Sequence, residues 1–161
     1  MRQSLCVPLM TMIARMIFLS NSETIKIRYI DSPALEQNEK GGCIDLYNAN
    51  EITLKKGDWG FIHLGVSMKL PDGYDALLLP RSSTFKRYGI LLTNGAGYID
   101  NTFNGTDDEW LACVLATRDI TIPKGVRCFQ FRLFKQQANI IFEETDSLNL
   151  NNRGSYGSSG I

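Results

Sequence analysis

Short apolar runs dominate the middle of this chain, and turn-forming residues separate them. The runs cover residues 44–47, 59–64, 66–70, 76–79, 90–93, 110–116 and 128–134. The turn signals between them are Lys56-Gly57-Asp58, Pro71-Asp72-Gly73, Asn94-Gly95 and Pro123-Lys124-Gly125. Runs of this length that are broken by glycine and proline are typical of strands.

Helical periodicity is nearly missing from the sequence. No segment sustains it for three turns, and the best helix candidate is a single turn at Thr84–Tyr88, with Ser82 or Ser83 as its cap. Near the start, Ile25, Ile27 and Tyr29 alternate with charged residues, as in a half-buried strand. These patterns predict an all-β barrel or sandwich with at most one short helix.

The size and charge of the chain limit its function. It has 161 residues, which suffice for one domain with a proper core. Hydrophobic residues make up 43% and charged residues 21%, as in globular proteins. Lys+Arg and Asp+Glu balance at 17 each, so no overall positive field indicates a nucleic-acid polymer as partner.

The cysteines and the single histidine argue against a zinc site. Cys6, Cys43, Cys113 and Cys128 are widely scattered, and His63 is the only histidine. We expect reduced, partly buried thiols in a cytoplasmic protein, with disulfides as the alternative. His63 lies in an alternating apolar stretch, which favours a structural role.

The two ends of the chain differ from its middle. Residues 1–22 are apolar, but Arg15 interrupts them before they reach membrane-spanning length. We expect a non-core extension there rather than a targeting segment, and no membrane partner. The Gly/Ser/Asn-rich end can bury little surface. We therefore expect a β-barrel domain over residues 23–146 and a flexible tail over residues 147–161.

Two segments carry polar residues that suit an anionic ligand. Asp45 lies inside an apolar strand segment, where a carboxylate needs a partner, and neighbouring backbone or an arginine would satisfy it without any function. Arg81, Ser82 and Ser83 follow Pro80 at a possible helix start. A cation and hydroxyls in that place suit phosphate, although a capped surface turn would look the same.

Three further segments have more functional residue types than packing requires. In residues 93–105, two apolar strands flank glycines and indicate a hairpin whose backbone can read a pyrimidine edge. Gln130 lies among apolar neighbours and needs hydrogen-bond partners. The tail carries Arg153 and Tyr156, which suit a flat anionic ligand. An ordinary hairpin tip and an ordinary disordered terminus are the alternatives.

The order of these five segments resembles that of the motifs of the trimeric dUTPase family. They read GCIDLY, PRSST, NGAGYIDNTFNG, RCFQF and RGSYGSSG, and the resemblance covers roughly residues 25–161. It implies an all-β, distorted β-barrel of jelly-roll type in a homotrimer with shared active sites. It also implies a dUTP diphosphatase, which hydrolyses dUTP to dUMP and pyrophosphate with Mg²⁺.

The resemblance implies catalytic roles for two carboxylates. Asp100 would be the general base that orients and deprotonates the attacking water, mainly through positioning. Asp45 would support the water and metal network. Mg²⁺ would be held chiefly by the triphosphate and its own waters, with no direct protein ligand.

The substrate-binding roles follow in the same way. Asn94 and the backbone of Gly97, Tyr98 and Ile99 would read uracil, and Phe103 would pack on the deoxyribose, where the family more often has Tyr.

The phosphates would be held by residues of the second, fourth and fifth motifs. Arg81, Ser82, Ser83 and Gln130 would bind them, with Ser82 polarising the α–β bridging oxygen. Arg153 would reach the γ-phosphate while Tyr156 stacks on the base.

Two departures from the family pattern stand out, and two other functions stay open. The fifth motif is about two residues shorter than usual, and Thr106-Asp107-Asp108-Glu109 forms an acidic insertion. We expect a longer hairpin or bulge there, with carboxylates that face solvent or bind an extra cation. A related dCTP deaminase would need a Glu in the strand at 110–116, which has no acid. A nucleotide-gated regulator that binds a partner protein is the other alternative.

Overall fold

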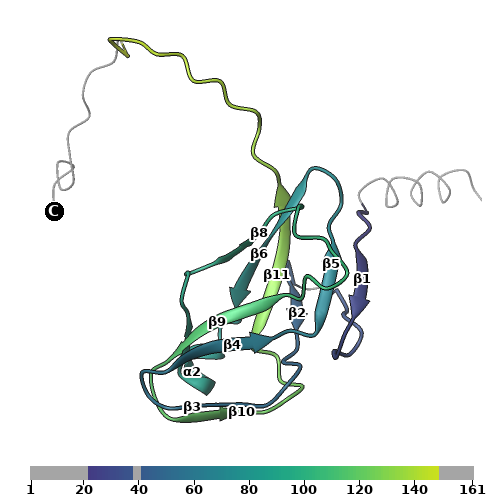
Figure 1. Cartoon of the computed structure of the whole chain (residues 1–161), viewed down its shortest axis with the longest axis vertical. Helices are drawn as coiled ribbons and strands as arrows, with labels where there is room; N and C mark the ends of the chain where they lie inside the picture. The colour runs from purple at the N-terminus through teal and green to yellow at the C-terminus, as the bar shows by residue number, and fades with distance from the viewer. Residues whose placement is uncertain (1–21, 38–40, 149–161) are drawn as a thin grey trace, which may run out of the picture.

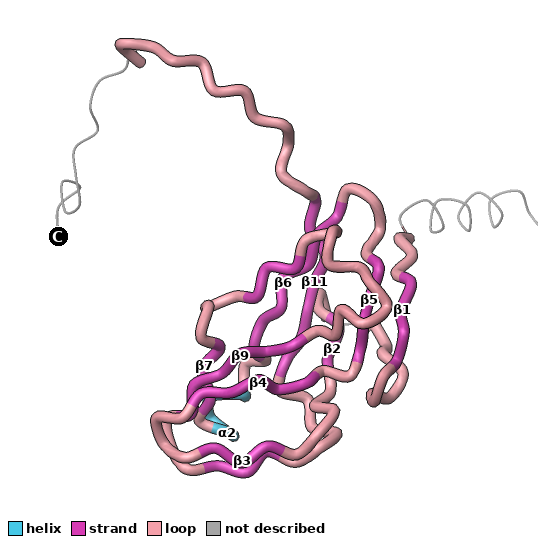
Figure 2. The backbone as a smooth tube through the Cα atoms, viewed as in Figure 1, coloured by secondary structure: helices cyan, strands magenta, loops and turns pink. Residues whose placement is uncertain are grey.

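The computed structural model describes residues 22–37 and 41–148 (Figure 1; Figure 2). Cys6, Arg153 and Tyr156 lie outside them. The elements are β1 (Lys26–Tyr29), β2 (Ile44–Leu46), β3 (Ile52–Leu54), β4 (Trp59–His63), β5 (Val66–Lys69), β6 (Tyr74–Pro80), α2 (Thr84–Tyr88), β7 (Ile90–Leu92), β8 (Gly97–Ile99), β9 (Leu111–Ala116), β10 (Ile120–Ile122) and β11 (Phe129–Lys135). The expected all-β fold and its single short helix are confirmed.

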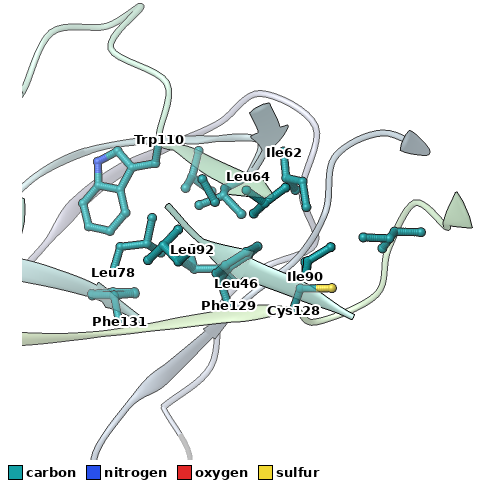
Figure 3. Close-up of a cluster of buried hydrophobic side chains, with 14 of the residues drawn as sticks. Leu46, Ile62, Leu64, Leu78, Ile90, Leu92, Trp110, Cys128, Phe129 and Phe131 are labelled. Carbon is teal, nitrogen blue, oxygen red and sulfur yellow. The ribbon is translucent and has the colours of Figure 1, made fainter. Parts of the chain in front are cut away.

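Two sheets form the body of the fold. One has the strand order β2-β11-β6-β8 and the other β4-β9-β7, and all of their pairs are antiparallel. Their inner faces share one core, in which the rings of Trp110 and Phe131 pack edge to face (Figure 3). The centres of the two rings are 5.2 Å apart. Two smaller sheets, β1-β5 and β3-β10, complete the described part of the fold.

Each predicted turn contains a glycine with a backbone angle that other residues rarely adopt. Gly57, Gly73, Gly95 and Gly125 have φ values of 90°, 79°, 70° and 78°. A glycine has no Cβ to oppose a positive φ, so it can occupy this place in the turn at low cost. These glycines explain why the apolar runs stop where they do.

Three short strands lie outside the apolar runs of the sequence. β3 and β10 pair with each other, and the hydroxyls of Thr53 and Thr121 meet across them at 2.9 Å. Each has only two strongly apolar residues, too few for a periodic signal. β8 is the third, within the glycine-rich segment.

Residues 136–148 follow β11 as an extended arm that leads away from the body (Figure 1). The side chains of Ile141 and Phe142 are each 93% exposed there.

The thiols of the described cysteines are free. They belong to Cys43, Cys113 and Cys128, and burial raises the pKa of the Cys128 thiol to about 12. Reduced thiols were expected for these three. Within residues 22–37 and 41–148, no helix is long and apolar enough to cross a membrane.

Candidate active site

The first, second and fourth motifs meet at one pocket of about 500 Å³. Strand register brings them together, because Asp45 of β2 is level with Gln130 of β11, which is level with Leu79 at the end of β6. We call this space the arginine pocket. It is lined by Glu36, Gln37, Gly41, Gly42, Cys43, Asp45, Tyr47, Arg81, Ser82, Arg127 and Gln130.

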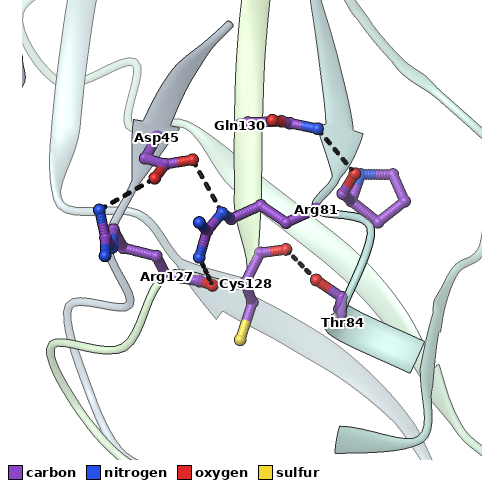
Figure 4. Close-up of polar contacts among 7 residues, drawn as sticks. Asp45, Arg81, Thr84, Arg127, Cys128 and Gln130 are labelled. Atoms are coloured by element: carbon purple, nitrogen blue, oxygen red, sulfur yellow. Dashed lines mark hydrogen bonds and ion pairs between the residues drawn. The ribbon is translucent and has the colours of Figure 1, made fainter. Parts of the chain in front are cut away.

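Asp45 holds two arginines in the arginine pocket (Figure 4). Its carboxylate lies 2.8 Å from Nε of Arg81 and 3.1 Å from Nη1 of Arg127, and 25% of the side chain is exposed. Arg81 also donates to the carbonyl of Arg127 at 3.2 Å. These contacts satisfy the carboxylate and fix both guanidinium groups.

Arg127 is a site residue that the sequence analysis quoted but did not assign. It stands first in the fourth motif, and its guanidinium lies 6.0 Å from the centre of the Tyr47 ring. A charged residue directly before a buried strand was the only local signal, since nothing in the sequence shows that it meets Asp45.

The second motif continues into helix α2. Ser83 is the N-cap residue, but its side chain makes no capping hydrogen bond. Thr84 anchors the turn instead, because its buried hydroxyl donates to the carbonyl of Cys128 at 2.5 Å. The helix thus begins after one of the two serines expected as its cap, although the Ser83 hydroxyl does not make the capping bond. Ser82 is exposed and lines the arginine pocket.

Gln130 finds the partner that its surroundings require. Its amide nitrogen donates to the carbonyl of Pro80 at 3.2 Å (Figure 4). The amide therefore ties β11 to the end of β6, and the side chain still borders the pocket.

The third motif is not the paired hairpin that the sequence suggested. β7 pairs with β9, whereas β8 pairs with β6, so the two strands belong to different sheets. The turn between them holds Asn94, which is exposed. A Cβ on Gly97 would lie 3.0 Å from Cβ of Leu78. Close packing of β8 on β6 thus favours glycine at this position, and the apolar flanks of the segment face two different partners.

A second pocket, of about 310 Å³, lies at the end of β8. We call it the Asp100 pocket. It brings together four residues of the third motif with Leu111 of β9 and the two residues before that strand; the lining residues are Tyr98, Ile99, Asp100, Phe103, Glu109, Trp110 and Leu111.

The Asp100 carboxylate is exposed and fixed by its own loop. Its Oδ1 accepts from the N–H of Thr102 at 2.7 Å and from the Thr102 hydroxyl. These two hydrogen bonds, the hydroxyl first, lower the pKa of Asp100 below its ordinary 3.8. The carboxylate is therefore ionised at neutral pH. Both of these hydrogen bonds go to Oδ1, and the backbone N–H of Phe103 is a further donor to the carboxylate.

The acidic insertion after Gly105 folds back on the protein. Glu109 accepts from the N–H of Gly65 at 3.0 Å and lies 2.8 Å from Nδ1 of His63. Asp108 accepts from the N–H of Gly105, and Asp107 lies 3.4 Å from Arg28. Asp108 and Glu109 thus have protein partners, whereas the side chain of Asp107 is 94% exposed and faces solvent, as expected. His63 has the structural role that was expected.

The two pockets are separate within one subunit. β2 and β8 form opposite edges of their sheet, and three strand spacings put about 14 Å between them. The register adds an offset along the strands, because Asp45 is level with Leu79 whereas Ile99, next to Asp100, is level with Ala76. One subunit does not bring Asp45 and Asp100 to a common point.

No group of three His, Cys, Asp or Glu side chains within residues 22–37 and 41–148 forms a metal-binding set. Among the residues that the structure describes, the carboxylates at the arginine pocket are those of Asp45, which is paired with two arginines, and of Glu36. Such a pocket fits Mg²⁺ only if a ligand brings most of the oxygen donors.

Sequence comparisons identify relatives of this chain. The dUTPase family model matches residues 28–160. A prophage-derived deoxyuridine 5'-triphosphate nucleotidohydrolase of Bacillus subtilis is 41% identical over 138 residues, covering 84% of this chain and 97% of that protein. The deoxyuridine 5'-triphosphate nucleotidohydrolase of Rickettsia felis is 35% identical over 127 residues, covering 76% of this chain and 84% of that protein.

Solved structures share the fold. A mutant dUTPase of Staphylococcus bacteriophage 80alpha with dUpNHpp superposes with a TM-score of 0.72 at 19% identity, covering 87% of this chain and 100% of that one. A mutant dUTPase of Staphylococcus aureus phage phi11, which coordinates a structural Mg(II) ion, superposes with a TM-score of 0.67 at 15% identity. The superposition covers 79% of this chain and 99% of that one. With its five motifs in order and the family model matched over residues 28–160, this chain belongs to the dUTPase family.

Proposed function

We propose that this chain hydrolyses dUTP to dUMP and pyrophosphate, in a homotrimer whose active sites are shared between subunits. The proposal depends chiefly on the exposed Asp100 carboxylate, which lines the same pocket as Phe103 and whose Oδ1 is fixed by Thr102. Family membership supports the substrate, because the relatives are named for dUTP.

Asp100 is the general base in this proposal. Its carboxylate takes a proton from a water, and the water oxygen forms a bond to the α-phosphorus. The bond between that phosphorus and the α–β bridging oxygen breaks, and its electron pair leaves with pyrophosphate. Since the pKa of Asp100 is lowered, the base is weak, and most of its contribution comes from placing the water.

The phosphates bind in the arginine pocket. Arg81 donates forked hydrogen bonds to their oxygens, the Ser82 hydroxyl contacts the α–β bridge, and Ser83 and Gln130 complete the set. Arg153 and Tyr156, which lie outside the described residues, close over the γ-phosphate and the base.

Mg²⁺ accompanies the triphosphate. The formal charges of the described residues that line the arginine pocket cancel, with Arg81 and Arg127 against Asp45 and Glu36. A triphosphate therefore needs further positive charge. A bound Mg²⁺ would supply this charge and would stabilise the negative charge that develops on the leaving pyrophosphate, and Asp45 would be the residue that supports it from the protein.

Uracil is read at β8. This strand pairs with β6 alone among the described strands, so the backbone groups on its other edge are open to a base. Paired donors and acceptors on Gly97 and Ile99 match uracil, and the Asn94 side chain adds a polar contact. A cytosine edge would leave these groups unpaired, which is the basis for rejecting it.

Assembly is supported by apolar surface that a single subunit leaves exposed. On the outer face of β4-β9-β7, Trp59, Phe61 and Leu91 are 65%, 48% and 46% exposed, and the exposed Leu115 lies level with both Trp59 and Leu91. Ile141 and Phe142 on the arm are almost fully exposed. A contiguous apolar face and an apolar arm are typical of surfaces that other subunits cover.

Mixing two impaired variants, with activity measured at dUTP concentrations well below KM, tests the shared sites. Asp100→Asn subunits keep the arginine pocket, and Arg81→Ala subunits keep Asp100. If each site joins these parts from neighbouring subunits, an equal random mixture regains about a quarter of the wild-type activity per site. Mixtures that are no more active than the sum of their parts would show that the sites are not shared.

The assay that tests the function itself is pyrophosphate release with Mg²⁺. We expect dUTP to be hydrolysed far faster than dCTP, dTTP or UTP. A wild-type protein that is inert toward dUTP would end the proposal. Release of ammonia from dCTP would instead indicate a deaminase, although β9, Leu111–Ala116, carries no acid for that chemistry.

The remaining parts of the chain are assigned within the same proposal. Residues 1–22 stay outside the β-barrel domain of residues 23–146, and residues 147–161 deliver the fifth motif to a neighbouring subunit. The free thiols of Cys43, Cys113 and Cys128 support a reducing, cytoplasmic environment.

A further inference from the structure

Asp75 is a buried carboxylate that belongs to none of the five motifs. It is the second residue of β6, and only 3% of it is exposed. A buried carboxylate is strongly unfavourable unless hydrogen-bond donors surround it. Its partners therefore indicate which parts of the fold depend on it.

Three donors meet at Asp75, and two of them come from residues beside Asp100. The hydroxyl of Tyr98 donates to Oδ2, and the N–H of Asn101 donates to Oδ1 at 3.0 Å. The third donor is the side-chain amide of Gln136, at 2.9 Å from Oδ1. Asp75 thus contacts the chain on both sides of Asp100 and also the first residue of the arm.

The Asp100 loop has few other ties to the sheet. The hydrogen bonds from Thr102 to Asp100 lie within the loop, so they orient the carboxylate but do not fix the loop on β6. The side chain of Asn101 donates to the carbonyl of Pro71 at 3.1 Å. Together with Asp75, this bond attaches the loop to β6 and to the turn before it.

We propose that Asp75 is a positioning residue for Asp100, because it anchors the flanking Tyr98 and Asn101 and links their loop to the start of the arm through Gln136. This inference rests on the proposed role of Asp100 as the base. Misplacement of a reacting group by about 1 Å can reduce the rate by about 10²-fold, so an anchor at this point affects turnover more than binding.

The acceptor oxygens of Asp75 matter in this role more than its charge. Hydrogen bonds from Tyr98 first, and then Gln136, lower the pKa of Asp75, so the carboxylate is ionised. An asparagine keeps one oxygen for the N–H of Asn101 and the amide of Gln136, and its NH₂ can donate to the Tyr98 oxygen. An alanine keeps none of these bonds.

The test compares Asp75→Ala with Asp75→Asn. For Asp75→Ala we expect kcat to fall by about 10- to 100-fold. Its dissociation constant for a dUTP analogue with an imido group between the α- and β-phosphates should stay within about threefold of wild type. Asp75→Asn should keep kcat within about threefold of wild type. Rates are divided by the number of sites that bind the analogue, so that loss of folded protein does not imitate the effect.

Asp119→Ala is the matched control. Asp119 also accepts a backbone N–H, from Lys56 at 2.8 Å, and a side-chain donor, Lys55 at 3.1 Å, but it lies before β10, away from both pockets. We expect a lower melting temperature and an unchanged kcat. If Asp75→Ala yields no folded protein, Tyr98→Phe replaces it, with an expected several-fold loss of kcat at unchanged analogue binding.

Three results would overturn the inference. The first is a wild-type kcat in Asp75→Ala, or in Tyr98→Phe where Asp75→Ala does not fold. The second is an equal loss of kcat in Asp75→Ala and Asp75→Asn, and the third is a loss of kcat that is matched by a loss of analogue binding. An inert wild-type protein would contradict the proposed hydrolase instead, so the two failures are distinguishable.

Discussion

The arginine pocket and the Asp100 pocket are built in different ways. Strand register forms the first, because β2, β11 and the end of β6 lie side by side and their charged groups are already paired. A short loop forms the second, with Asp100 held by its own neighbour Thr102. Three strands therefore hold the charged binding surface in place, whereas the position of the proposed base depends on a few local hydrogen bonds.

Substitutions in the two pockets should therefore have different kinetic signatures. Changes in the arginine pocket should weaken the hold on phosphate and appear mainly in KM. Changes around Asp100 should move or remove the reacting group and appear mainly in kcat.

The largest effect is expected for Asp100→Asn. The amide cannot take the proton from water, so kcat should fall by about a thousandfold, in the range usual for loss of a general base. The dissociation constant of the imido analogue should change little, as isothermal titration calorimetry would measure. If Asp100→Asn lost analogue binding as much as turnover, the two pockets would not differ in their effects on kcat and KM.

The next effect in size is expected for Arg81→Ala. This change removes a forked phosphate donor and leaves Asp45 with Arg127 alone, so kcat/KM should fall by about a hundredfold, mainly through KM. Arg118→Ala is the control, because Arg118 donates to the carbonyls of Lys86 and Arg87 at the end of α2. The Arg118→Ala substitution should lower the stability of the folded protein and leave KM for dUTP unchanged. A loss confined to kcat in Arg81→Ala would contradict the assignment.

A smaller effect should appear in the response of stability to acid. The folded-state pKa values of Asp75 and Asp100 lie below the ordinary 3.8, so both groups contribute stability that is present above that pH and is lost as pH falls through their folded pKa values. Urea unfolding between pH 6 and pH 3 should show this loss, and Asp75→Asn should reduce it. An unchanged slope in that variant would mean that Asp75 is not responsible.

The smallest effect is expected for Phe103→Tyr. Phe103 is 41% exposed in the Asp100 pocket and has no hydroxyl to bond with a ligand or with the loop. Restoring the hydroxyl should raise the preference for dUTP over UTP by about two- to fivefold, as one added exposed hydrogen bond allows. Competition between the two nucleotides would measure this ratio. An unchanged preference would show that the ring alone excludes the 2′-hydroxyl.

Much of the fold was predictable because its signals are local. Glycines with positive φ lie in the predicted turns, and α2 is the single helical turn expected after Arg81. β3 and β10 were missed, because three-residue strands carry too little periodicity. Strand pairing is not local either. β7 and β8 flank one turn and look like a hairpin, yet they pair with β9 and β6.

The site was predictable only where a motif names its residues. Asp45, Arg81 and Gln130 were each selected from the sequence, and the structure brings them to one pocket. Asp75 escaped notice, because an acid near the start of a strand looks like ordinary solvent exposure. Its donors come from 23, 26 and 61 residues away, and such distances leave no trace in a single sequence.

The position of β11 has a consequence for synthesis of the protein. This strand is the last one in the described part of the chain, yet it lies in the interior of its sheet, between β2 and β6. Until residues 129–135 have left the ribosome, β2 and β6 each expose an unpaired edge and Asp45 lacks Gln130 beside it. A nascent chain therefore cannot complete the arginine pocket early, and a stalled or truncated product would be prone to aggregation before it could bind a nucleotide.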